Sequence, residues 1–212
     1  METIMSKAIW MLMYDLAGED ESEYNQWFHK THIPDKLTRR GYNWAGHYKL
    51  NKGTRHVALF GGKNSTVFFN PSPTQLKVKQ DDLTRQMIAL RKKSLSLIFC
   101  EEWTCKGPQF SCRPGEACEL LIGNAEDDET FNAWLAQEFA PTFANRIGAV
   151  RARKLLCTTG PVRHGLLLQY DTSEHLNNAR IAWPYPLIVN HSTPFVGKRL
   201  WPQGGKGCKT FM

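Results

Sequence analysis

The sequence predicts an α+β fold made of two tandem units, each with the element order βαββαβ. Three observations predict it: an internal repeat, apolar runs of strand length that alternate with amphipathic helical segments, and turn signals between paired strands. The chain has 212 residues, of which 42% are hydrophobic and 22% charged. This length and composition suit one large domain or two small ones, each able to bury a core.

The repeat emerges when the chain is aligned with itself at an offset of 107 residues, the separation of Tyr24 and Phe131. Three features then recur in register: an aromatic-Asn-x-Trp motif, a proline and a glycine, at Tyr24–Trp27 and Phe131–Trp134, Pro34 and Pro141, and Gly41 and Gly148. Recurrence of all three indicates a duplicated unit.

The first unit begins with a nearly continuous apolar run, Ala8–Leu16, which suits a strand buried on both faces. A helix capped by Ser22 follows, and Pro34 ends or kinks it before a shorter turn. The core-facing stripe of that helix consists of Tyr24, Trp27, Phe28 and Thr31. The remaining predicted elements are strands Tyr42–Leu50 and His56–Gly61, helix Asp81–Lys92 and strand Leu95–Trp103.

The second unit is predicted to have the same order of elements. They are strand Glu119–Ile122, helix Asp128–Arg146, strands Ala149–Cys157 and Gly165–Tyr170, a helical stretch Glu174–Ala182 and strand Phe195–Trp201. Residues 106–116, rich in Pro, Gly, Gln and Ser, form a linker expected to make few contacts. We therefore place the first unit at 1–105, the linker at 106–116 and the second unit at 117–212.

The charge pattern argues against nucleic-acid binding. The chain has a formal net charge of +7 and a pI near 9.1, but its lysines and arginines are scattered. The densest runs, Lys36–Arg40 and Arg91–Lys93, have the placement of helix ends. We expect instead a positive surface that attracts a small carboxylate or phenolate substrate.

The sequence also predicts a cytoplasmic protein with free thiols. No apolar run approaches the roughly 20 residues that span a bilayer, and Ala8–Leu16 lacks the cleavage site of a signal peptide. The six cysteines are therefore expected to be reduced. Four of them lie between Cys100 and Cys118, but their spacing matches no paired C-x-x-C pattern, so no metal site is predicted.

The stretch Asn25–Pro34, with the sequence NQWFHKTHIP, and the following Gly41-Tyr42 resemble the first-helix signature of the dimeric α+β barrel superfamily, in particular its EthD-like branches. The resemblance covers the chain to about Leu50. It implies that each unit is ferredoxin-like and that the two antiparallel sheets pack face to face into an α+β barrel. Because this fold hosts cofactor-free monooxygenases, cyclases, lactone isomerases, decarboxylases and haem enzymes, it implies no single chemistry.

Three imidazoles of the first unit have no counterpart in the second. At the repeat offset His29, His32 and His47 align with Ala136, Phe139 and Lys154. This asymmetry makes His29, His32 and His47 catalytic candidates, because imidazole exchanges protons near neutral pH. A structural or surface role is the alternative for each of them. The histidines of the second half, His164, His175 and His191, share no spacing and are predicted to lie at the surface.

Tyr14, at the end of the first strand, is a fourth catalytic candidate, with a core aromatic as the alternative. The substrate-binding candidates are Asn25, Trp44 and Arg40. Asn25 shares a helical stripe with His29, and Arg40 can attract a substrate carboxylate. Strand alternation puts Trp44 and the strand histidine on opposite faces, and the pattern leaves open which face lines a cavity.

These residues predict a cofactor-independent lyase or isomerase that acts on a small aromatic, anionic substrate by histidine acid-base catalysis, in a decarboxylation, elimination or ring-closing step. One alternative is a cofactorless or haem-dependent monooxygenase, in which His32 or His29 ligates iron or assists oxygen chemistry. A second is a non-enzymatic ligand-binding scaffold. Neither nucleic acid nor a membrane is an expected partner, and the formation of a homodimer is left open.

Overall fold

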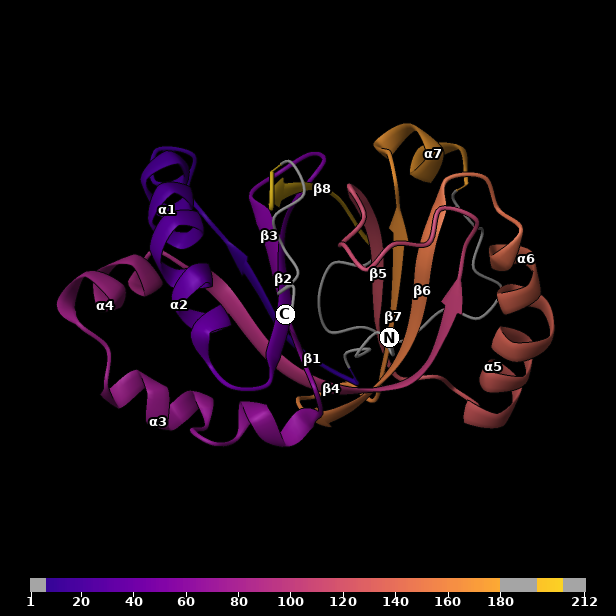
Figure 1. Ribbon diagram of the computed structural model, residues 1–212, viewed down its shortest axis with the longest axis horizontal. Helices are drawn as coiled ribbons and strands as arrows, with labels where there is room; N and C mark the ends of the chain where they lie inside the picture. The colour runs from indigo at the N-terminus through magenta and orange to yellow at the C-terminus, as the bar shows by residue number, and fades with distance from the viewer. Residues whose placement is uncertain (1–6, 180–193, 204–212) are drawn as a thin grey trace.

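The structure is a computed structural model that describes residues 7–179 and 194–203. Within these residues, eight strands form a closed antiparallel barrel with helices on its outside (Figure 1). The fold class is therefore α+β, as the sequence predicts. Residues 180–182 of the predicted helical stretch, His191 and Cys208 lie outside the described residues.

The strands run in the order β1-β3-β2-β8-β5-β7-β6-β4 around the barrel. Their bounds are β1 Ala8–Asp15, β2 Tyr42–Leu50, β3 Arg55–Gly62, β4 Lys92–Lys106, β5 Ala117–Gly123, β6 Ala149–Thr159, β7 His164–Tyr170 and β8 Phe195–Trp201. The order β2-β3-β1-β4 in the first half recurs as β6-β7-β5-β8 in the second. Pairing of β2 with β8 and of β4 with β6 closes the barrel.

Helices cover the outer face of each half. The α-helices are α1 Glu21–Trp27, α2 Ile33–Thr38, α3 Pro73–Val78, α4 Asp82–Ala89, α5 Asp128–Trp134, α6 Ala140–Ala144 and α7 Ser173–Asn178. In Figure 1, α1 to α4 lie to the left of the barrel, whereas α5 and α6 lie to its right. Short helical turns η1 (Phe28–His32), η2 (Ser65–Phe68) and η3 (Leu135–Phe139) complete the set.

Strand β1 alternates between two buried faces, which explains why it is apolar along nearly its whole length. Ile9, Met11 and Met13 point into the barrel, whereas Trp10 and Tyr14 point outward and pack under the helices. The barrel interior is filled from both halves, with Trp44, Tyr48, Val57, Leu59, Leu97, Phe99, Leu120, Ile122, Leu155 and Leu167 among its residues. Residues that carry chemistry on an outward position therefore lie between sheet and helices.

Each half contains a wide π-helical turn at the same place in the repeat. One spans Phe28–His32 and the other Leu135–Phe139, and each leads into an α-helix with Pro34 or Pro141 in its first turn. Proline has no N–H to donate, and its ring crowds the carbonyl four residues earlier, so a locally wider turn accommodates it. Helical backbone thus continues through Pro34, and both candidate histidines of the first helix lie in the wide turn.

Some element bounds differ from those predicted. The first helix begins at Glu21 instead of being capped by Ser22. The fourth strand extends over Lys92–Lys106, so the predicted helix Asp81–Lys92 is shorter. The sequence analysis missed α3, although a capping box that starts at Ser72 marks its beginning.

The segment 107–116 between the halves is held against the barrel by hydrogen bonds, although the sequence predicted few contacts for it. Side chains from both halves donate to its backbone carbonyls: Tyr48 to Gly115, Arg151 to Ser111 and Arg199 to Pro114. These bonds satisfy carbonyls that would otherwise lack partners against the barrel. The segment therefore ties the two halves together.

Close packing of the barrel predicts that Gly61→Ala is destabilising. The indole of Trp44 lies over Gly61 on the neighbouring strand, and a Cβ at this glycine would overlap the ring. We expect a loss of about 1–3 kcal/mol in the free energy of unfolding, because overpacking forces the strands apart. Chemical denaturation followed by circular dichroism measures it. Gly18→Ala, where nothing lies within 4 Å of the added Cβ, is the control, and equal stability of the two variants would contradict this packing.

Candidate active site

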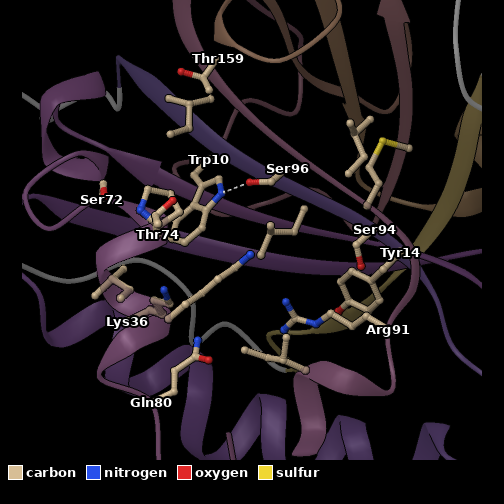
Figure 2. Close-up of a pocket in the computed structure, with 18 of the residues that line it drawn as sticks. Trp10, Tyr14, Lys36, Ser72, Thr74, Gln80, Arg91, Ser94, Ser96 and Thr159 are labelled. Atoms are coloured by element: carbon tan, nitrogen blue, oxygen red, sulfur yellow. Dashed lines mark hydrogen bonds between the residues drawn. The ribbon is translucent and has the colours of Figure 1, made fainter. Parts of the chain in front are cut away.

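A cavity of about 470 Å³ lies between the outer face of the first-half sheet and helices α2, α3 and α4. Strands β1 and β4 form its floor, as the view in Figure 2 shows. Much of its lining is apolar or aromatic, including Trp10, Leu12, Leu76, Ile88 and Ile98. A concave apolar space of this volume with a few polar groups is typical of a small-molecule site.

Two cationic side chains reach into this cavity. Figure 2 shows the Nζ of Lys36 and the guanidinium of Arg91 pointing toward one another across it. Lys36 is 5% exposed, and its Nζ lies 4.3 Å from the centroid of the Trp10 ring. Arg91 donates through Nε to the Tyr24 hydroxyl at 2.7 Å and lies over the ring of Tyr14. Among the described residues, neither cation forms an ion pair with a carboxylate.

A chain of hydrogen bonds leads from the cavity toward the protein surface. The hydroxyl of Tyr14, which lines the cavity, lies 3.0 Å from Nε2 of His47. Nδ1 of His47 lies 2.8 Å from Nε2 of His29. Tyr14 and His47 are fully buried, whereas His29 is half-buried. A neutral imidazole has one donor and one acceptor, so a proton can pass along this chain in either direction.

Burial sets the protonation states of these groups. It lowers the pKa of His47 and of His32 well below the ordinary imidazole value, and nearby positive charges add to the effect. Burial, together with the charge of His56, lowers the pKa of His29 to about 4. Burial raises the pKa of Tyr14 well above its ordinary value. At neutral pH the imidazoles of His29, His32 and His47 are therefore neutral bases, and the phenol is a protonated acid.

His32 presents an imidazole to the cavity wall. Its ring stacks on Phe28, with the two centroids 5.4 Å apart, and its centroid lies 4.7 Å from that of the Trp27 ring. Packing between aromatic rings fixes the orientation of the imidazole. The wide turn of the helix thus provides both a cavity base, His32, and the outer end of the hydrogen-bond chain, His29.

A further imidazole, His56 on β3, belongs to the same cluster, although the sequence analysis did not select it. Its ring is stacked on that of Tyr14 at 5.8 Å and lies 5.3 Å from that of His47. Its Nδ1 lies 2.9 Å from the Thr54 carbonyl, and its Nε2 lies 3.5 Å from a carboxylate oxygen of Glu21. The register that places His56 opposite Tyr14 could have identified it only once the strand pairing was known.

The structure brings four predicted residues together: Tyr14 and His32 at the cavity, and His47 and His29 behind it. The described residues that line the cavity do not include Asn25, Trp44 or Arg40. Trp44 points into the barrel, on the face of β2 opposite His47, and the Arg153 guanidinium lies 4.7 Å from its ring.

The other two predicted binding residues lie outside the cavity as well. Asn25 is half-buried on α1, four residues before His29, and its Oδ1 has no hydrogen-bond partner among the described residues. Arg40 is exposed in the turn between α2 and β2.

Sequence reasoning missed Lys36 and Arg91, which it interpreted as cations at helix ends. Both lie near helix ends, but they point into the cavity. The prediction that His164 lies at the surface is wrong, because this side chain is 1% exposed, with Nε2 2.6 Å from Asp128 and Nδ1 3.0 Å from Lys154 Nζ. Lys154 and His164 are polar residues that each lie next to an apolar run within a strand segment, and this pattern could have identified His164 as buried.

Within residues 7–179 and 194–203, no three or more His, Cys, Asp and Glu side chains are grouped so that they can hold a metal ion. The described cysteines, Cys100, Cys105, Cys112, Cys118 and Cys157, are free thiols. In the same part of the chain, the helices are all too short or too polar to cross a membrane.

No protein-family model and no curated protein matches this chain. Solved structures do share its fold. An anthrone oxidase-like protein superposes with a TM-score of 0.64 at 9% identity, over 93% of this chain and 92% of that one. A provisionally assigned monooxygenase from Lactobacillus acidophilus NCFM has a TM-score of 0.57 at 16% identity, over 84% of this chain and 83% of its own.

A provisionally assigned chlorite dismutase is also similar, with a TM-score of 0.54 at 12% identity over 92% of this chain and 95% of that one. All three are proteins of the dimeric α+β barrel superfamily. The similarity shows that this chain has the α+β barrel fold, and at these identities it shows the fold alone.

We predict that the free energy of unfolding decreases as the pH falls below 6.5. The pKa values of His29, His32 and His47 are lowered in the folded state, so the unfolded chain binds more protons between the ordinary value of 6.5 and the folded values, and acid favours unfolding. His47→Gln should flatten this dependence, because it removes one such group. Urea denaturation at several pH values measures it, and an unchanged slope in His47→Gln would count against a buried neutral imidazole.

Proposed function

We propose that this protein is an enzyme that transfers protons to and from a small aromatic, anionic substrate in the first-half cavity, without a cofactor. The observation that carries the proposal is the convergence of a neutral imidazole, a protonated phenol and a guanidinium on one apolar cavity, from His32, Tyr14 and Arg91. A base, an acid and a cation are the groups that proton transfer at carbon requires. The reaction is a lyase or isomerase step such as decarboxylation, elimination or ring closure.

In this mechanism His32 acts as the general base. Its imidazole is neutral at neutral pH, so it can accept a proton from a phenol or an acidic C–H of the substrate. The negative charge that develops on the substrate is stabilised by the guanidinium of Arg91. The apolar lining of the cavity strengthens this attraction, because it excludes water from around the charges.

Tyr14 acts as the general acid. Its raised pKa keeps the hydroxyl protonated, so it can give a proton to a substrate carbon or to a leaving group. It then regains a proton along the chain through His47 to His29, whose half-buried ring exchanges protons with solvent. The two histidines behind the cavity thus return the acid to its starting state.

An oxygenase is the second candidate, and it fits the names of two similar structures, an anthrone oxidase-like protein and a provisionally assigned monooxygenase. Deprotonation of an aromatic substrate by the same base would give an electron-rich carbanion or phenolate able to react with oxygen. In a haem-dependent form, His32, which lines the cavity, would ligate the iron. A ligand-binding scaffold without catalysis is the remaining alternative.

We also propose that the chain arose by duplication of one ferredoxin-like unit. The recurrence of the strand order and of the wide turn before a proline supports this proposal. The catalytic groups are then a property of the first unit, because Ala136, Phe139 and Lys154 replace its histidines in the second.

The proposal predicts turnover of aromatic carboxylates or phenols by protein purified without haem or added metal. Tyr14→Phe and His32→Ala should each lower kcat by about 10²–10⁴-fold, the usual contribution of a positioned acid or base. Product mass by liquid chromatography, with oxygen consumption recorded in parallel, identifies the reaction.

Lys30→Ala is the matched control, because Lys30 is exposed in the same wide turn and should retain full activity. Loss of carbon dioxide or water from the substrate without oxygen uptake supports the lyase. Product formation that needs oxygen supports the oxygenase, and a Soret band with activity only after haem addition supports its haem form. Full activity in Tyr14→Phe and His32→Ala would remove these residues from the mechanism.

A further inference from the structure

The amine of Lys36 is buried without a carboxylate partner. Its side chain is 5% exposed on α2, and its Nζ lies over the face of the Trp10 indole. Among the described residues its ammonium forms no ion pair. The side chain that it faces across the cavity, Arg91, is also positively charged. A buried charge without a partner is costly, so the position calls for an anion.

The groups that surround Lys36 are mainly positive. Arg39 at the C-terminal end of α2 and Arg91 beyond α4 disfavour its charged form, whereas Asp35 on α2 favours it. Arg39 forms an ion pair with Asp35 at 3.3 Å, and the Asp35 side chain is 63% exposed, so this carboxylate faces solvent. The other titratable groups among the described lining residues are the neutral His32, Tyr14 and the exposed Lys77 on α3. Uncharged polar side chains also line the cavity, namely Ser72, Thr74, Gln80, Ser94, Ser96 and Thr159.

We propose that the cavity recognises an aromatic carboxylate, whose carboxylate group lies between Lys36 and Arg91, and that binding of this anion is coupled to the uptake of a proton by Lys36. This inference rests on the proposed function only for the existence of a ligand in the cavity, and it does not depend on the reaction. It assigns substrate recognition to two cations that lie inside the cavity, whereas Arg40 lies outside it.

The proton uptake follows from the electrostatics. Burial, with help from Arg39 and Arg91, lowers the pKa of Lys36 to about 7, so above that pH most of the free protein carries a neutral amine. A carboxylate placed beside the amine favours the ammonium form and raises the pKa toward its ordinary value. The bound complex therefore holds more protons than the free protein at pH values between about 7 and 10.

The cavity walls select an aromatic body for this anion. Leu12, Leu76, Ile88 and Ile98 contribute apolar surface to the lining of the cavity. The Trp10 indole is held in place by a hydrogen bond from Nε1 to the hydroxyl of Ser96, 2.9 Å long. A flat apolar ring fits this apolar part of the lining.

The test is calorimetric titration with 4-hydroxybenzoate and with its neutral analogue 4-hydroxybenzamide. Each is titrated at about pH 8 in phosphate and in Tris, because the difference in heat between buffers of unlike ionisation enthalpy gives the number of protons taken up. We expect the carboxylate to bind at least about tenfold more tightly than the amide. We also expect proton uptake that approaches one per ligand for the carboxylate and none for the amide.

Variants assign the proton to Lys36. Lys36→Met should weaken carboxylate binding and abolish proton uptake, whereas Lys36→Arg should retain binding without uptake, since a guanidinium stays charged. Lys77→Met is the matched control, because Lys77 also lines the cavity but is exposed, and it should keep wild-type uptake. Circular dichroism confirms that each variant is folded.

Three results would overturn the inference. They are equal affinity for the carboxylate and the amide, unchanged proton uptake in Lys36→Met, and no binding of 4-hydroxybenzoate or of the larger 2-naphthoate at about 10 mM, a concentration that detects even weak complexes. Binding with the expected uptake but without turnover of any bound compound would leave the anion site standing and count against the proposed enzyme. The results that would contradict the anion site therefore differ from the result that would contradict the proposed enzyme.

Discussion

Closure of the barrel through the β2–β8 and β4–β6 pairs is the constraint on which the rest of the structure depends. Once the barrel is closed, side chains from both halves fill its interior, and the imidazoles lie on the outer face under the helices. Alternation along β2 places Trp44 inside and His47 outside. An outer face that carries polar groups can pack under helices only if those groups satisfy one another, and the chain from Tyr14 through His47 to His29 does this.

The second half has the same arrangement of strands, but its buried polar cluster consists of different residues. Lys154, fully buried where the first half has His47, places its Nζ 2.9 Å from a Glu102 carboxylate oxygen and 3.0 Å from His164, which in turn bonds Asp128. Because this amine has a carboxylate within ion-pair distance, its charge is compensated within the protein. The cluster is complete without a ligand, which distinguishes it from the first-half cavity.

Sequence patterns predicted the order of strands and helices along each half and an irregularity in the first helix near Pro34, because the first follows from local periodicity and the second from the proline that each half repeats. They selected Tyr14, at the end of the first strand, and His32, in the segment that resembles a known helix signature, and both residues line the cavity. Arg91 and Lys36 were not selected as binding residues, because their position in the cavity depends on how the start of β4 and helix α2 are placed in space. His56 escaped because it joins the cluster through strand pairing, and Trp44 was selected although it faces the barrel interior.

The first half differs from the second because it buries an amine, that of Lys36, which forms no ion pair with a carboxylate among the described residues. Neutral imidazoles and a protonated phenol can be buried at little cost when they bond to one another, but a lysine beside a second cation raises the free energy of the folded state. The apolar interior of the barrel and the hydrogen bonds to segment 107–116 stabilise the fold and offset this cost. Since binding of an anion would remove that cost at Lys36, the same amine would contribute both to the affinity for an anion and to the selectivity for its charge.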